Sequence, residues 1–251
     1  MKEILWPLIL ASIAGFSTML GCIGIFIPTK KKDSFITFSI SLSLSVMLMV
    51  SVFDLIPSSL ASIGSDILIG VSIFAVFFSL GVVMVGLLNR AIEREKGKGS
   101  KNGNLYKLGI LSFIALVLHN LPEGILTFMS TYQDFNLGVS LCIAIALHNI
   151  PEGISIAVPI FYSTGSVKKA LKYTFLSALA EPIGAILAYL IFKNFITDQM
   201  VSMFLILVAG IMVTLSIEKM LPEALSYNKK KPLIYGLISG IVIVTLSLII
   251  L

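Results

Sequence analysis

Residues 108–130 read LGILSFIALVLHNLPEGILTFMS, and residues 137–160 read LGVSLCIAIALHNIPEGISIAVPI. Each stretch is long and apolar, and each carries the pattern His-Asn-x-Pro-Glu-Gly about halfway along its length. A helix needs roughly 20 predominantly apolar residues to cross the hydrocarbon core of a membrane. The two stretches therefore predict neighbouring transmembrane helices with ionisable residues at mid-depth.

Six further apolar runs of similar length accompany this pair. In lipid, every backbone N–H and C=O group must find a partner inside its own segment, so such runs form helices. The short alternating strands of an outer-membrane barrel are absent. We predict an all-α polytopic fold, a bundle of eight transmembrane helices that forms a single domain over residues 1–251. The predicted spans are 4–27, 34–56, 67–89, 108–130, 137–160, 171–192, 200–221 and 233–251.

Composition supports a membrane protein and argues against other classes. The chain is 57% hydrophobic and only 12% charged, whereas soluble domains carry about 25% charged residues. Its net charge of +5 does not indicate nucleic-acid binding, because most basic residues flank the spans, where they orient the helices and contact anionic lipid headgroups. The first run exceeds a signal-peptide core in length, so we expect it to be retained as a helix. Cys22 and Cys142 lie in separate runs and are predicted to be free thiols.

The basic residues fall on one side of the predicted bundle. The other side has only Lys2 and Lys193. Cytoplasmic loops carry the excess of Lys and Arg, so we predict a multi-pass protein of the cell (plasma or inner) membrane with both termini extracytoplasmic. Residues 91–106, rich in Gly, Lys and Asn, are predicted to form a flexible cytoplasmic linker. The residues on the basic side are Lys30, Lys31, Lys32, Arg90, Arg94, Lys96, Lys98, Lys101, Lys107, Lys168, Lys169, Lys172, Lys229, Lys230 and Lys231.

The two histidines of the chain, His119 and His148, are each followed by a glutamate four residues later, Glu123 and Glu152. Residues at i and i+4 share a helix face, so each helix presents one imidazole and one carboxylate together. An ionisable residue at mid-membrane costs roughly 2.5–3.5 kcal/mol on insertion scales. The four side chains must therefore face one another or line a wet cavity. Carboxylate and neutral imidazole are natural ligands of dications, which predicts a metal site.

Proline and glycine inside each motif shape the helices around this site. Pro122 and Pro151 lack the N–H that would continue the helical ladder, so we predict a kink at each, with a carbonyl freed for metal or water. Gly124 and Gly153 permit close helix approach. The motif recurs after 29 residues on the next, antiparallel helix. This arrangement predicts a local two-fold axis in the membrane plane, as in carriers built from inverted repeats.

The motifs HNLPEG and HNIPEG, on the fourth and fifth of eight spans, resemble those of the ZIP (Zrt-, Irt-like) family of divalent metal transporters. Chain length and the short third connection are most similar to the bacterial ZupT branch. Shorter matches occur at Asp54-Leu55-Ile56-Pro57, at Ala180-Glu181-Pro182 and at Glu218-Lys219-Met220-Leu221-Pro222. Some relatives have two acidic residues where this chain has Glu218 and Lys219, so we place Glu218 outside the core site.

The resemblance implies a binuclear metal centre at mid-membrane. Its first site would comprise His119, Glu123, His148 and Glu152, and its second Asn120, Asn149 and Glu181, with Glu123 and Glu152 bridging the two. The resemblance also implies that Asp54 lies at the metal entrance near the outer end of the second span, and that the protein forms a homodimer in the lipid bilayer.

Three functions fit such a site. Mixed His, Glu and Asn ligands suit Zn²⁺, Fe²⁺, Mn²⁺, Co²⁺ and Cd²⁺, so our leading hypothesis is a carrier that moves these ions, Zn²⁺ first, into the cytoplasm by alternating access. In this hypothesis the two motif helices slide against the rest, and the metal is transported substrate rather than a prosthetic group. An intramembrane zinc hydrolase would need an open metal position and a carboxylate base, and the His-Glu-x-x-His signature is absent. A passive metal channel remains an alternative.

Overall fold

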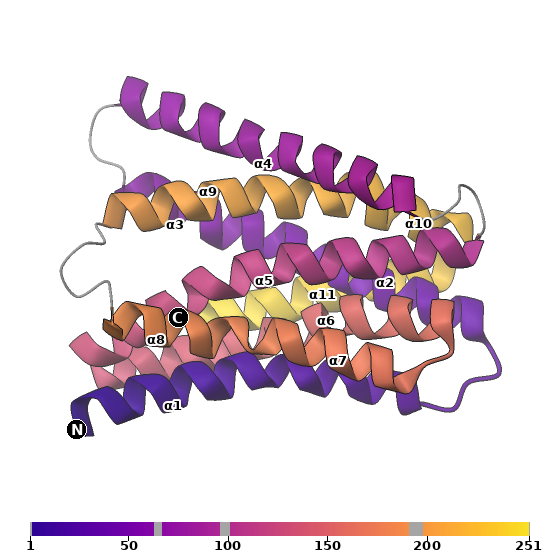
Figure 1. The fold of residues 1–251 in the computed structure, drawn as a ribbon, viewed down its shortest axis with the longest axis horizontal. Helices are drawn as coiled ribbons and strands as arrows, with labels where there is room; N and C mark the ends of the chain where they lie inside the picture. The colour runs from indigo at the N-terminus through magenta and orange to yellow at the C-terminus, as the bar shows by residue number, and fades with distance from the viewer. Residues whose placement is uncertain (1, 63–66, 96–100, 191–197, 251) are drawn as a thin grey trace.

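The computed structural model describes residues 2–62, 67–95, 101–190 and 198–250, and its helices run side by side along one bundle (Figure 1). Within those ranges, eight helical spans are long and apolar enough to cross a membrane, and no strand occurs. The predicted all-α polytopic fold is therefore confirmed. The N and C labels lie at the same end of the bundle, as an even number of spans requires (Figure 1).

Several spans join more than one helical segment. The first passes from an α-helix into a 3₁₀ segment, the second and seventh each contain a π-helical turn, and the sixth is interrupted at Leu179. In chain order the elements are α1 (Lys2–Ser17), η1 (Thr18–Phe26, 3₁₀), α2 (Lys32–Val50), η2 (Ser51–Leu55, π), α3 (Ile56–Ser62), α4 (Ile67–Glu95), α5 (Lys101–Gln133), α6 (Phe135–Thr164), α7 (Val167–Ala178), α8 (Ala180–Leu190), α9 (Asp198–Leu215), η4 (Ser216–Met220, π), α10 (Leu221–Ser226) and α11 (Lys230–Ile250).

The predicted linker over 91–106 is wrong in extent, because α4 continues to Glu95 and α5 already begins at Lys101. Lys, Arg and Glu are good helix formers, so a helix persists beyond the apolar run that marks its membrane depth. Only residues 96–100 of the predicted linker fall outside the described ranges. Several other helices also extend beyond the predicted spans; α6, for example, begins at Phe135, where Asp134 caps it by accepting a hydrogen bond from the Leu137 N–H.

The two motif helices, α5 and α6, pack along each other inside the bundle. The α1 helix contacts both, α8 packs on α5, and η1 packs on α6. On the other side, α2 packs along α11, while α4 lies on the outside of the bundle and packs mainly on α9 (Figure 1). The centre of α5 and α6 is thus enclosed by protein, which lets polar groups lie at membrane depth.

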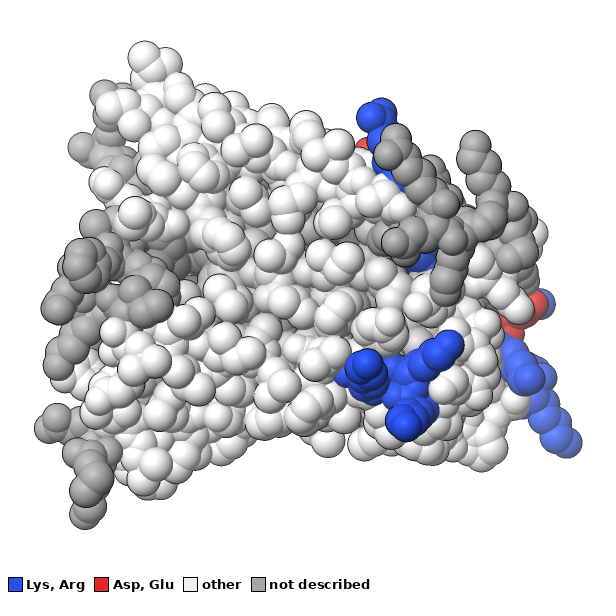
Figure 2. Space-filling model, viewed as in Figure 1, with Lys and Arg blue, Asp and Glu red and all other residues white. Residues whose placement is uncertain are grey.

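Lys and Arg gather at one end of the bundle on the visible face, opposite the end that carries the N and C labels (Figures 1 and 2). This agrees with the one-sided charge pattern of the sequence. Lys193, predicted for the opposite side, lies outside the described residues.

The motif glycines lie at the closest helix contacts. A Cβ placed on Gly124 of α5 would collide with the backbone carbonyl of Glu181 on α8. A Cβ on Gly153 of α6 would collide with the backbone carbonyl of Thr18 in η1. The predicted close approach at both positions is confirmed, and it draws one outer helix against each motif helix.

The two π-helical turns share a sequence pattern of serine, a charged residue and proline. Ser51, Asp54 and Pro57 have the same spacing as Ser216, Lys219 and Pro222. A proline ring clashes with the carbonyl four residues before it, and a wider turn just before the proline relieves that clash. Each turn places one acidic residue, Asp54 or Glu218, in the widened part of its span.

Candidate metal centre

The centre is built from two helices that each supply an imidazole and a carboxylate. His119 and Glu123 lie one turn apart on α5, and His148 and Glu152 lie one turn apart on α6. Each of these four residues is buried, with at most 4% of its surface exposed. Both helices continue across Pro122 and Pro151, so neither proline ends its helix.

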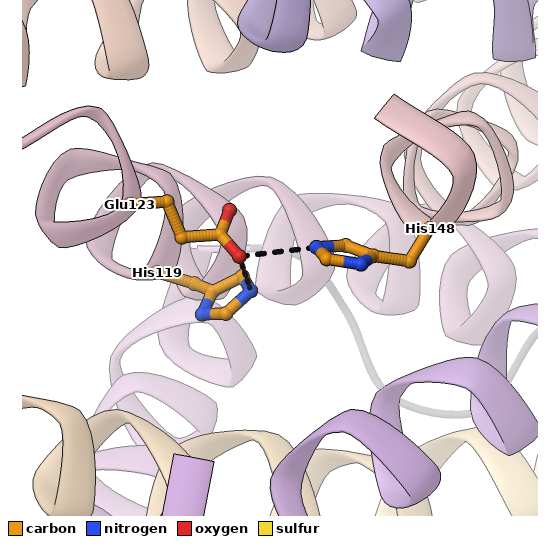
Figure 3. Close-up of side chains that lie close together, drawn as sticks. All are labelled: His119, Glu123 and His148. Atoms are coloured by element: carbon orange, nitrogen blue, oxygen red, sulfur yellow. Dashed lines mark hydrogen bonds and ion pairs between the residues drawn. The ribbon is translucent and has the colours of Figure 1, made fainter. Parts of the chain in front are cut away.

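A single carboxylate oxygen joins the two histidines. Oε1 of Glu123 lies 3.1 Å from Nε2 of His119 and 3.1 Å from Nε2 of His148. Figure 3 shows the two rings reaching this oxygen from different helices. Oε1 of Glu152 lies 3.6 Å from His119 Nε2. The candidate ligand atoms of His119, Glu123 and His148 all lie within 4.8 Å of one another, close enough to share one ion.

Several polar atoms of this centre have no hydrogen-bond donor among the residues that the structure describes. Both oxygens of Glu152 and Oε2 of Glu123 are buried and, within the described part of the chain, without a hydrogen-bond partner. Burying a carboxylate without compensation is costly, and such groups pair with cations or coordinate metals. The donor set therefore fits a bound cation better than a purely structural network.

The second predicted group lies beside the first. The Asn149 Nδ2 group donates to Oε1 of Glu181 at 2.5 Å and to the backbone carbonyl of Ala14 at 3.0 Å. This contact brings α6, α8 and α1 together. The opposite oxygen of Glu181 and both side-chain polar atoms of Asn120 are buried, with no hydrogen-bond partner among the described residues. Amide and carboxylate oxygens of this kind can coordinate hard and borderline cations.

Asp54 and Glu218 each lie in one of the two π-turns. Asp54 lies in η2, close enough to interact electrostatically with His148 and Glu123. Glu218 lies in η4 with its side chain 56% exposed, and its Oε2 lies 3.9 Å from Nζ of Lys219. This exposure is consistent with the predicted place of Glu218 outside the core site.

Sequence reasoning missed two backbone supports of the centre. Ser43 of α2 donates its hydroxyl to the carbonyl of Pro151, inside the α6 motif, at 2.5 Å. The Ala14 carbonyl of α1 holds the Asn149 amide. A row of serines at every second position in α2, from Ser39 to Ser45, is the only sequence signal that could have suggested the first of these contacts.

The cysteines take no part in the centre. Cys22 and Cys142 are buried free thiols, as predicted, and the Cys142 thiol donates to the Leu10 carbonyl on α1 at 3.3 Å. Imidazole, carboxylate and amide groups without thiolate suit borderline dications rather than Cu(I).

A family model described as the ZIP zinc transporter matches residues 89–248, which include both motif helices and the helices that follow them in the chain. The chain belongs to the ZIP family. Three curated relatives named "Zinc transporter ZupT" align along nearly their whole length. The protein of Oceanobacillus iheyensis is 40% identical over 100% of both chains. That of Chlorobium phaeovibrioides is 38% identical over 100% of both chains, and that of Clostridium perfringens is 35% identical over 99% of this chain and 97% of its own.

Membership in the ZIP family separates a metal transporter from an intramembrane hydrolase. ZIP proteins are transporters rather than enzymes, so the intramembrane hydrolase is set aside. The buried His–Glu cluster of this ZIP chain fits a metal site.

Proposed function

We propose that this ZIP chain carries divalent transition-metal ions across the membrane, with Zn²⁺ as the leading substrate and Fe²⁺, Mn²⁺, Co²⁺ and Cd²⁺ as further ones. The observation that supports the proposal most directly is the sharing of Glu123 Oε1 by His119 and His148, at 3.1 Å from each Nε2. The naming of the full-length relatives as zinc transporters favours Zn²⁺. The metal is cargo, and no prosthetic group is required.

The ion would occupy two adjoining positions. The first uses His119, Glu123, His148 and Glu152, whose ligand atoms converge at the α5–α6 contact. The second uses Asn120, Asn149 and Glu181, with Glu123 and Glu152 shared between the positions. Three carboxylates among these ligands offset most of the charge of two dications, which reduces the cost of holding them at membrane depth.

We propose inward flux in the cell membrane with both termini extracytoplasmic. The support is the one-sided distribution of Lys and Arg (Figure 2). In this orientation Asp54 would receive metal near the outer side and pass it to the buried histidines. A homodimer is retained as a further proposal, which light scattering of the purified protein in detergent tests.

The decisive experiment measures uptake of radioactive zinc into proteoliposomes. We expect the His119→Ala/Glu123→Ala double variant to lose uptake, because it removes both α5 ligands of the first position. Glu218→Gln provides the matched control, since it removes a carboxylate with a 56% exposed side chain outside the cluster. Unchanged uptake by the double variant would reject the assigned site. A competition series with the other four ions in the same vesicles ranks the substrates.

The same vesicles separate a carrier from a channel. In a carrier, the rate of tracer uptake saturates as the metal concentration rises. Unlabelled metal inside the vesicle also speeds tracer uptake, because a metal-loaded carrier reorients toward the outside faster than an empty one. A channel shows no such acceleration.

A further inference from the structure

A basic pocket lies at the lysine-rich end of the bundle, where the segment before and at the start of α2 meets the residue before α11. It has a volume of about 690 Å³ and is lined by Thr29, Lys30, Lys31, Lys32, Asp33, Ser34 and Lys229. Four lysines and one aspartate give this lining a net positive charge. The segments are adjacent because α2 packs along α11.

Three features of the pocket favour an anion. The four lysine side chains are exposed and can turn toward a ligand. Thr29 and Ser34 add hydroxyl donors. The helices α2 and α11 begin at Lys32 and Lys230, and the positive end of a helix dipole attracts negative charge. Lysine is a common partner of phosphate. Asp33 is the one group in the lining that opposes an anion.

The position of the pocket indicates where the phosphate would come from. Its lysines lie at the ends of two membrane spans, Lys32–Ala61 and Lys230–Ile250, which is the depth of lipid headgroups. From there, Ile234, Ile238 and Ile241 run down one exposed face of α11 with 45–53% of each residue accessible. That face offers an acyl chain a continuous apolar surface, whereas a free phosphate would use the pocket alone.

We propose that this pocket binds the phosphate headgroup of an anionic phospholipid, with an acyl chain lying along α11. Basic pockets between transmembrane helices are known to hold such headgroups. The lipid links the start of α2 to the start of α11 through its phosphate. The site is separate from the metal centre and does not depend on the proposed transport function.

The test compares two triple variants of equal charge. Lys30→Gln/Lys32→Gln/Lys229→Gln removes lysines that line the pocket. Lys168→Gln/Lys169→Gln/Lys172→Gln removes three exposed lysines at the start of α7 that do not line it. Each protein is purified in detergent, its melting temperature is checked, and binding of phosphatidylglycerol and of phosphatidylcholine is titrated by native mass spectrometry.

We expect the wild-type protein and the α7 variant to bind phosphatidylglycerol in preference to phosphatidylcholine. The pocket variant should lose about a hundredfold in phosphatidylglycerol affinity, because it removes three lysines and each basic residue near an anionic headgroup contributes roughly a fivefold factor. Raising the salt concentration should weaken binding to the wild-type protein, since exposed charges are screened.

Three outcomes would overturn the proposal. One is equal loss in both triple variants, which would indicate diffuse surface charge. The second is equal wild-type affinity for the two lipids. The third is displacement of phosphatidylglycerol by inorganic phosphate at equal concentration, which would assign the pocket to a free phosphate. The melting temperature of the pocket variant separates lost binding from lost folding.

Discussion

Nε2 of His148 on α6 lies 3.1 Å from Oε1 of Glu123 on α5, although the two residues are 25 positions apart in the chain. The same oxygen lies 3.1 Å from His119 Nε2. One carboxylate therefore joins the imidazoles of both motif helices, which makes Glu123 the residue on which the assigned centre depends most.

Glu123→Gln keeps the shape of the side chain and removes its charge. We expect uptake of radioactive zinc to fall by at least about tenfold, because even the partners behind a metal ligand change affinity by roughly 10- to 100-fold. Glu218→Gln, tested in the same vesicles, should retain wild-type uptake. Equal activity of the Glu123 and Glu218 variants would contradict the assignment of Glu123.

Glu181→Gln should separate the two proposed positions. The Glu181 carboxylate accepts a hydrogen bond from Asn149 and is not part of the converging set of His119, Glu123 and His148. We expect the number of zinc ions bound per purified chain, measured by elemental analysis after equilibrium dialysis, to fall from two to one. Loss of both ions, or of neither, would contradict two positions of which only the second uses Glu181.

Gly124→Ala and Gly153→Ala should destabilise the bundle. Each new methyl group would meet a backbone carbonyl, of Glu181 or Thr18, and overpacking of this kind costs about 1–3 kcal/mol. We expect lower melting temperatures and reduced zinc uptake. Gly86→Ala on α4 is the matched control, because a Cβ there meets nothing within 4 Å. It should melt at or slightly above the wild-type temperature, since alanine favours helix over glycine.

Zinc uptake should decrease as the medium is acidified with equal pH on both sides of the vesicle. Imidazole and carboxylate bind metal in their deprotonated forms, so protons compete with the ion for every ligand of the centre. Lower pH therefore raises the apparent KM. Initial rates at a series of zinc concentrations and pH values measure the effect. A lower KM in acid would contradict competition at these ligands.

Membrane orientation is open to a labelling test. In a background where Cys22 and Cys142 are replaced by serine, Gln133→Cys should react with an impermeant maleimide added to intact cells. Thr29→Cys should react only after permeabilisation, because we propose that the basic end of the bundle faces the cytoplasm. The reverse pattern would place the termini inside the cell.

The sequence was sufficient to predict the bundle and the partners at its centre. Apolar runs located all eight spans, because lipid leaves a long apolar segment no alternative to a helix. The i, i+4 spacing of His119 with Glu123 and of His148 with Glu152 predicted two polar faces. The insertion cost of isolated charges predicted that these faces meet, as the 3.1 Å contact shows.

Other features depended on contacts that a sequence pattern does not encode. The ends of α4 and α5 extended into the predicted linker because charged residues form helix readily outside the membrane. The hydrogen bond from Ser43 to the Pro151 carbonyl joins residues 108 positions apart. The π-turn around Asp54 lies just before Pro57, where the helix accommodates the proline ring, and the apolar pattern of the span does not encode its position.

The glycine contacts also limit how α5 and α6 can shift relative to the helices packed on them. A shift of α5 past α8, or of α6 past η1, by even one residue would drive a side chain into a neighbouring main chain, because only Gly124 and Gly153 fit there. If transport involves movement of these helices, we therefore expect α5 and α6 to move together with the first and sixth spans as one rigid unit, larger than the two helices expected from sequence. In that case the ions would stay bound to the same side chains while the unit moves across the membrane, and would not pass between fixed sites.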